Sequence, residues 1–98
     1  MIIRIYRGTV FPGKEHIWQD RVEQLSIPWL KSRSGLIAFY PGKPMSESGS
    51  RTFCIVMIWD SVESIAAAMG ADWDAPVFLG DEAQLIEKSE LEHFELYP

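Results

Sequence analysis

The sequence is poor in the residues that build disulfides, zinc sites and basic surfaces. It has one cysteine, Cys54, and two histidines among its 98 residues. A single cysteine excludes an intrachain disulfide, and no Cys/His spacing typical of zinc is present. The 9 Lys and Arg residues stand against 14 Asp and Glu residues, which gives a formal net charge of −5. Phosphate backbones and anionic membrane surfaces attract basic proteins, so we expect neither nucleic acid nor a membrane as a partner.

Long hydrophobic runs are also missing. The apolar N-terminal stretch meets a charge at Arg4, so it is too short for a signal peptide or a membrane span, and we expect a cytoplasmic location. What is present is a 47% hydrophobic composition, which is typical of a globular core. The length predicts one domain over residues 1–98.

The order of periodic segments predicts an α+β domain with a βαββαβ arrangement. The expected strands cover residues 2–9, 36–40, 52–59 and 91–97. A first helix carries Trp18, Val22, Leu25 and Trp29 on one face. Pro28 predicts a break near Ser26, with Ile27 outside α geometry and Ser26 available to cap a short second turn through Lys31.

The later elements have clear boundary signals. Asp60 or Ser61 is expected to cap a second helix that Gly70 ends. Residues 71–80 are expected to be irregular, and residues 81–88 to form a short third helix. This order is the ferredoxin-like arrangement, in which the first and third strands lie at the centre of a four-stranded antiparallel sheet and the helices cover one face.

The inner strands are apolar on both faces. In the third strand Phe53, Ile55, Met57 and Trp59 alternate with Cys54, Val56 and Ile58. Helices cover one face only, and leaving the other in water forgoes about 1.5–3 kcal/mol for each large apolar side chain. The sequence therefore predicts a homodimer, the alternative being that residues 71–80 fold back over that face.

Several segments together resemble a known family: the Pro12-Gly13 turn, the strand 35–40, the Trp59-Asp60-Ser61 junction, the segment 70–77 and the ending 91–95. Over almost the whole chain they resemble the antibiotic-biosynthesis-monooxygenase-like domain of the dimeric α+β barrel superfamily. The resemblance implies a dimer with a pocket between the sheet and the helices of each protomer. It also implies small-molecule chemistry, in some relatives the oxidation of phenolic compounds by dioxygen without a metal or flavin cofactor.

Haem-degrading relatives carry a histidine ligand just past the second helix and an asparagine on the first strand. The corresponding region here, residues 77–81, has no histidine, and the first-strand position is Tyr6. Haem degradation is therefore not expected.

Three residues are candidates for chemistry on the central strands. His93 titrates near neutral pH and can move protons, or it can be a rim histidine paired with a carboxylate. Tyr6 and Arg4 share one face of the first strand. Arg4 can hold an anionic oxygen to which Tyr6 donates, or it can pair with a glutamate at the dimer surface.

Two aromatic residues are candidate substrate contacts. Trp73, in an acidic loop, can stack on an aromatic ligand or fill a gap in the core. Tyr40, at a strand end, can border a pocket or pack. Trp18, Trp29 and Trp59 are interpreted as core residues, and Cys54 as a buried neutral thiol.

Two functions fit these observations. The first is an oxygenase that acts on a small aromatic or phenolic substrate, with His93 and Tyr6 as catalytic residues and Arg4, Tyr40 and Trp73 contacting the substrate. The second is a non-catalytic homodimer that binds a small ligand or serves a structural or stress-related role. An open pocket of roughly 300 Å³ with convergent polar groups favours the first, and a pocket filled by aromatic side chains favours the second.

Overall fold

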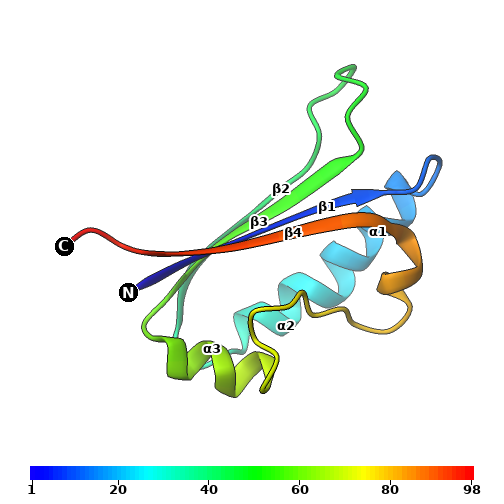
Figure 1. Ribbon diagram of the computed structural model, residues 1–98. Coiled ribbons are helices and arrows are strands. Elements are labelled where there is room, and N and C mark those ends of the chain that lie inside the picture. Colours follow the sequence, from blue (N-terminus) through cyan, green and yellow to red (C-terminus); the bar gives the residue numbers. More distant parts are fainter.

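The computed structural model describes residues 1–98, and its elements follow the predicted order (Figure 1). The strands are β1 (Ile2–Val10), β2 (Leu36–Gly42), β3 (Thr52–Trp59) and β4 (Ile86–Glu95). The helices are α1 (Glu15–Arg21), the π-helical turn η1 (Val22–Ser26), α2 (Ile27–Lys31), α3 (Val62–Met69) and the 3₁₀ turn η2 (Glu82–Leu85).

The sheet confirms the predicted topology. Its four strands pair in the order β2-β3-β1-β4, and every pairing is antiparallel. All helices lie on one side of the sheet (Figure 1). Trp18, Leu30 and Ile65 from these helices pack onto Phe53, Met57 and Trp59 of β3 and form the core. The ferredoxin-like α+β fold expected from the sequence is therefore present.

The sequence predicted a helix break near Ser26, ahead of Pro28, but the first helical region does not break there. The backbone stays helical through Ser26 and Ile27, and Ser26 makes no capping hydrogen bond. The Ile27 amide donates to the Val22 carbonyl, five residues back, so one wider turn precedes the proline. This extra residue per turn shifts the inner face of the helix. Ser26 is buried, whereas Leu25, expected inside, is 38% exposed.

The β3–α3 junction forms as predicted. The Ser61 hydroxyl accepts a hydrogen bond of 3.2 Å from the Ser64 amide, which makes Ser61 the N-cap of α3. Gly35, before β2, approaches this cap closely, and its carbonyl accepts a 2.8 Å bond from the Asp60 amide. A Cβ atom at Gly35 would lie 2.3 Å from Ser64 Oγ, and the Gly35 φ angle is +85°.

A Gly35→Ala variant is expected to lose about 2–3 kcal/mol of unfolding free energy, because it adds a clash to the cost of a left-handed backbone. Gly49→Ala is the matched control: its φ is also positive, at +77°, but nothing lies within 4 Å of the added atom. Urea unfolding of both variants separates the cost of the clash from the cost of the left-handed backbone. Equal losses in the two variants would show that the Gly35–Ser64 approach does not matter for stability.

The C-terminal strand differs from the prediction. Residues 81–88 were expected to be helical, but η2 is a single turn and β4 begins at Ile86. Residues 88–92 are charged or polar apart from Leu91, and as an edge strand β4 tolerates this because only β1 pairs with it. Residues 86–88, expected to be the end of that helix, belong instead to this edge strand.

The two faces of the sheet have different surroundings. Arg4, Tyr6, Gly8 and Val10 of β1 point toward the helices and are buried. Residues 71–80 also lie on the helix side, where Phe78 packs edge-on against Tyr6 with ring centroids 6.3 Å apart. The alternative in which this segment covers the other face is therefore wrong.

That second face, called the open face below, has nothing over it in the chain. Ile3, Ile5, Val56, Ile58 and Phe94 point to it, in the register that the strand pairs define.

Candidate functional site

A cavity lies between the sheet and the helices, next to the irregular segment. Twelve residues line it, nine of them hydrophobic. They are Arg4, Tyr6, Trp18, Ser26, Trp29, Leu30, Ile55, Met57, Met69, Val77, Leu79 and Glu82. The cavity volume is about 60 Å³, so in this conformation it holds solvent-sized molecules only.

Arg4 supplies a buried cation. Its residue exposure is 2%, and no carboxylate forms an ion pair with it. Its guanidinium donates to the main-chain carbonyls of Trp73 and, at 3.4 Å, Ala75. Burial lowers the pKa of Arg4 to about 10, an effect that the negative charge of Asp74 partly offsets. The group therefore remains positively charged at neutral pH, bound by main-chain carbonyls and in no ion pair with a carboxylate.

His93 lies beside Arg4 on the neighbouring strand, at the paired position of the β1–β4 ladder. Its Nε2 is 2.8 Å from Arg4 Nη1. Because a guanidinium only donates, Nε2 must accept, and the neutral ring carries its proton on Nδ1. Burial and the Arg4 charge lower the pKa of His93, with Asp74 opposing them. His93 is therefore a neutral partner that positions Arg4.

Tyr6 lies two residues further along the same face of β1. Gly8 makes room for it, since a Cβ atom at Gly8 would lie 2.4 Å from the Tyr6 hydroxyl oxygen. That hydroxyl is buried and has no hydrogen-bond partner. Burial, and then the nearby Glu82 carboxylate, raise the pKa of Tyr6 well above its ordinary value. Tyr6 is thus a proton donor to hydrogen bonds and not a base.

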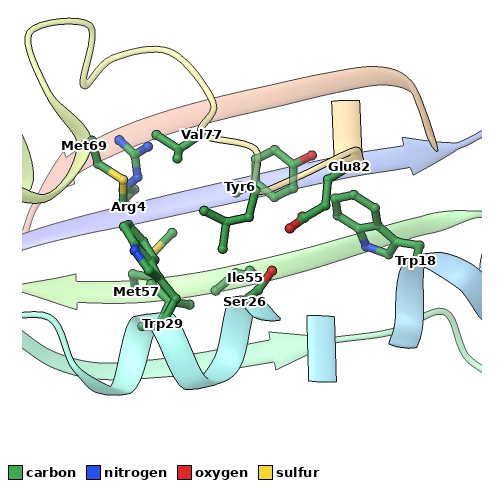
Figure 2. A pocket seen from close by; sticks show the side chains of 12 residues that line it. Arg4, Tyr6, Trp18, Ser26, Trp29, Ile55, Met57, Met69, Val77 and Glu82 are labelled. Carbon is green, nitrogen blue, oxygen red and sulfur yellow. The ribbon is translucent and has the colours of Figure 1, made fainter. Parts of the chain in front are cut away.

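Glu82 lies toward Trp18, at the end of the cavity away from Arg4 (Figure 2). Its residue exposure is 3%, and its Oε1 has no partner. The Arg21–Asp81 ion pair, at 2.9 Å, ties the turn that carries Glu82 to α1. Burial raises the pKa of the Glu82 carboxyl, while the Leu79 amide, the Ser26 hydroxyl and the Arg21 charge oppose that rise.

A Glu82→Gln variant is expected to be more stable than the parent protein at neutral pH, by about 1 kcal/mol or several degrees in Tm. A carboxyl whose folded-state pKa is raised favours the fold below its unfolded pKa, and this contribution is lost as pH rises through the folded value. The difference between variant and parent should therefore shrink on acidification below about pH 4. Thermal melts across pH measure it, and a gap that stays constant with pH would contradict this account.

The structure brings together four of the five residues singled out in the sequence. Arg4 and Tyr6 line the cavity, and His93 and Trp73 lie behind Arg4, where their rings meet edge-on with centroids 5.0 Å apart. Tyr40 is not part of this group, because β2 directs it to the open face, where it is 63% exposed. The Arg–Glu pair at the sheet surface is made by Arg7 and Glu92, not by Arg4.

Four residues of the site, Glu82, Ser26, Trp18 and Trp29, were not predicted from the sequence as site residues. Glu82 was expected only as part of a short helix over residues 81–88, and both tryptophans were interpreted as core. Two signals were present: Gly8 within a strand rich in β-branched residues, and two acidic residues, Asp81 and Glu82, between the apolar residues 77–79 and 85–86. Neither indicates which residues meet.

The site therefore has two polar ends joined by apolar walls (Figure 2). Arg4 is at one end and Glu82 with Trp18 toward the other. This lining, apolar walls with a few polar groups, is typical of small-molecule sites, although the present volume is far below theirs. No cluster of three His, Cys, Asp or Glu side chains has the geometry to hold a metal ion. None of the helices has the length and apolar composition needed to cross a bilayer.

The class of protein follows from the fold: a ferredoxin-like α+β domain with a cavity under its helices. No protein-family model matches the sequence, and no curated protein sequence does. Solved structures do match. An antibiotic biosynthesis monooxygenase superposes with a TM-score of 0.76 at 10% identity, covering 100% of both chains.

Two further structures have the same architecture. SnoaB from Streptomyces nogalater, a cofactor-independent oxygenase, superposes with a TM-score of 0.72 at 15% identity, covering 99% of this chain and 93% of its own. MhuD, solved as an R26S mutant with two manganese protoporphyrin IX molecules per active site, superposes with a TM-score of 0.71 at 18% identity. The match covers 98% of this chain and 94% of the MhuD chain. The chain therefore has the fold of these structures, which is the fold that the sequence resemblance implied.

Proposed function

We propose that this domain oxidises a small phenolic or related aromatic compound with dioxygen, without a bound cofactor. The observation that carries the proposal is the buried Arg4 guanidinium, which is cationic, lacks a carboxylate partner and borders an apolar cavity. An unpaired buried cation is costly unless an anion or dipoles compensate it. An oxyanion formed on an aromatic substrate supplies that compensation, and the fold shared with a cofactor-independent oxygenase supports the same reading.

The chemistry needs one base and one site for negative charge. The phenolic hydroxyl loses its proton, and the resulting anion is stabilised by a hydrogen bond from Tyr6 to its oxygen and by the Arg4 charge at the other end of the ring. The anion transfers one electron to dioxygen, and the carbon radical and superoxide then combine and take up a proton to give a hydroperoxide. Loss of water from the hydroperoxide leaves a carbonyl. One oxygen atom enters the product, the other leaves as water, and the substrate supplies the electrons.

The cavity must widen before such a substrate enters. Its volume of about 60 Å³ is below the roughly 300 Å³ typical of ligand sites. Met57 and Met69 in its wall are unbranched and change rotamer readily. Val77 and Leu79 come from the irregular segment, which Arg4 fastens through the Trp73 and Ala75 carbonyls. Access therefore depends on movement of this segment and of the two methionines.

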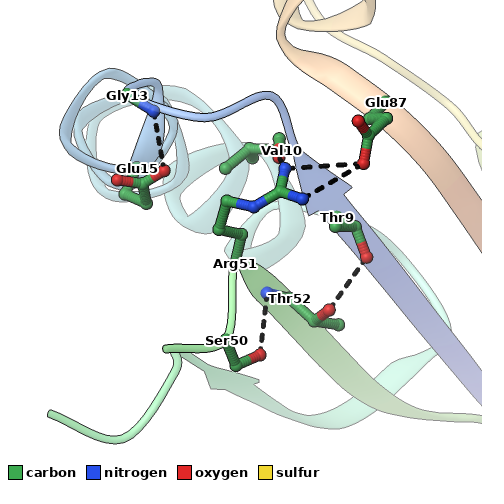
Figure 3. Close-up of polar contacts among 8 residues, drawn as sticks. All are labelled: Thr9, Val10, Gly13, Glu15, Ser50, Arg51, Thr52 and Glu87. Atoms are coloured by element: carbon green, nitrogen blue, oxygen red, sulfur yellow. Dashed lines mark hydrogen bonds and ion pairs between the residues drawn. The ribbon is translucent and has the colours of Figure 1, made fainter. Parts of the chain in front are cut away.

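We include a homodimer in the proposal, formed through the open face. The open face is apolar at the end of the sheet where β1 begins and where β3 and β4 end. Toward the other end Thr9 and Thr52 hydrogen-bond across the strands at 2.8 Å (Figure 3), and Arg7 pairs with Glu92. A second copy packed on the apolar end buries side chains that no part of this chain covers.

Oxygen uptake tests the proposed oxidation. Purified protein incubated with a panel of hydroquinones and anthrone-like phenols is expected to consume oxygen at least about tenfold faster than a Tyr6→Phe/His93→Ala double variant. The double variant loses the hydroxyl donor and the partner of Arg4 together. Uptake indistinguishable from that of the double variant across the panel would contradict the proposal.

The second candidate function is a non-catalytic ligand-binding dimer. Two observations favour it: the small cavity volume, and the use of the His93 Nε2 lone pair by Arg4, which removes it from proton transfer in this conformation. Ligand binding without oxygen uptake would support this second function.

A further inference from the structure

Four buried polar atoms without partners belong to residues that line the same cavity. One is Arg4 Nε at one end, and the other three are Tyr6 Oη, Trp18 Nε1 and Glu82 Oε1. The residues of these three are 8%, 3% and 3% exposed, so solvent does not compensate them. Each such atom costs about 1–3 kcal/mol of stability, and native proteins leave few of them. Three toward one end of a cavity indicate a missing ligand group.

The hydrogen-bonding capacity of these three atoms limits which ligand group can satisfy them. The indole N–H only donates, the phenol donates or accepts, and a carboxylate accepts. A ligand hydroxyl matches all three, because it donates to Glu82 and accepts from Trp18 or Tyr6. A bare carboxylate or carbonyl has no proton to offer and would leave the ionised Glu82 facing a second acceptor.

We propose that Tyr6, Trp18 and Glu82 form a subsite for an aromatic hydroxyl group, and that Glu82 is the residue that takes the proton from the bound molecule. This inference rests on the proposed function, for which it supplies the base. The negative charge left on the ring is conjugated toward the Arg4 end of the cavity. The preferred ligand is therefore an aromatic compound with a hydroxyl at one end and an acceptor oxygen at the other.

The other candidate bases are less suitable. His93 does not line the cavity, and its Nε2 already accepts from Arg4. Burial and the Glu82 charge keep Tyr6 protonated. Burial raises the pKa of the Glu82 carboxyl, which makes it a stronger base than an exposed carboxylate. The titratable groups around it are Arg21 from α1, Asp81 from its own turn and Tyr6 from β1.

Binding of 4-nitrophenol tests the subsite without requiring turnover, because its nitro oxygens match Arg4 and its phenol and phenolate forms differ in colour. Trp18 and Trp29 line the cavity, so their fluorescence reports binding. The protein is expected to bind the probe as phenolate at pH values where free probe is mainly neutral. Glu82→Gln should weaken binding about 10- to 100-fold and leave the probe neutral. Glu63→Gln, an exposed residue on α3, is the control.

Each outcome decides the inference. Because Glu82→Gln is expected to be stably folded at neutral pH, weaker binding by this variant cannot be attributed to unfolding. Trp18→Phe removes one hydrogen-bond donor and should by itself weaken binding about tenfold. Glu82→Gln behaving like Glu63→Gln, in affinity and in probe colour, would overturn it. Glu82-dependent binding without oxygen uptake on any phenol would reject the proposed oxidation and leave the hydroxyl subsite standing.

Discussion

An Arg4→Gln variant is expected to lose oxygen uptake on phenolic substrates by about 10²–10³-fold, because it removes the only cation at the developing oxyanion. Glutamine keeps a hydrogen-bond donor of smaller reach but no charge. Since Arg4 also fastens the Trp73 and Ala75 carbonyls, the variant should release part of the segment that borders the cavity. We therefore expect kcat to fall more than the affinity for 4-nitrophenol.

Arg51→Gln is the matched control for this experiment. Arg51 also donates to a main-chain carbonyl, that of Val10, and it contacts Glu87 at 3.4 Å, but it lies outside the cavity (Figure 3). It should lose a similar number of contacts and little activity. Oxygen uptake that falls equally in both variants, or that survives in Arg4→Gln, would mean that Arg4 is structural and does not stabilise an oxyanion.

The second large effect concerns the proposed dimer. Ile5 lies on the open face of central strand β1, opposite Val56 of β3. An Ile5→Asp variant places one uncompensated carboxylate on each protomer of a symmetric interface, at a cost of several kcal/mol per charge. We expect the dimer dissociation constant to rise by about 10³-fold or more, so that the variant sediments as a monomer at micromolar concentration.

Ser34→Asp, which adds the same charge at an exposed position outside the sheet, should leave the assembly unchanged. Far-UV circular dichroism checks that Ile5→Asp keeps its secondary structure. A parent protein that is already monomeric would reject the dimer. A variant that remains dimeric would place the interface on another surface.

Much of the fold was predictable because its signals are local. The alternation of Phe53, Ile55, Met57 and Trp59 with smaller apolar residues gave the bounds of β3 to the residue. Ser61 and Gly70 enclose α3 as expected. The shared face of Arg4 and Tyr6 followed from the two-residue period of a strand. Such features depend on spacing along the chain alone.

The errors arose where long-range packing overrides local preference. Pro28 predicted a break, but one wider helical turn absorbed the missing hydrogen bond and placed Ser26 inward in place of Leu25. Residues 86–88 were expected to end a short helix, yet pairing with β1 made them part of a strand. A bulge between Leu36 and Ala38 likewise directs Tyr40 away from the cavity.

The sequence by itself determined the order of elements, the central position of β1 and β3, and an apolar second face of the sheet, because each follows from short-range periodicity and topology. Only the tertiary structure decided that Glu82 faces Tyr6 and Trp18, and that Arg4 contacts His93 and lacks a carboxylate. These residues come from segments up to 89 positions apart. Their meeting depends on how the helices and the irregular segment pack on the sheet, which spacing along the chain does not encode.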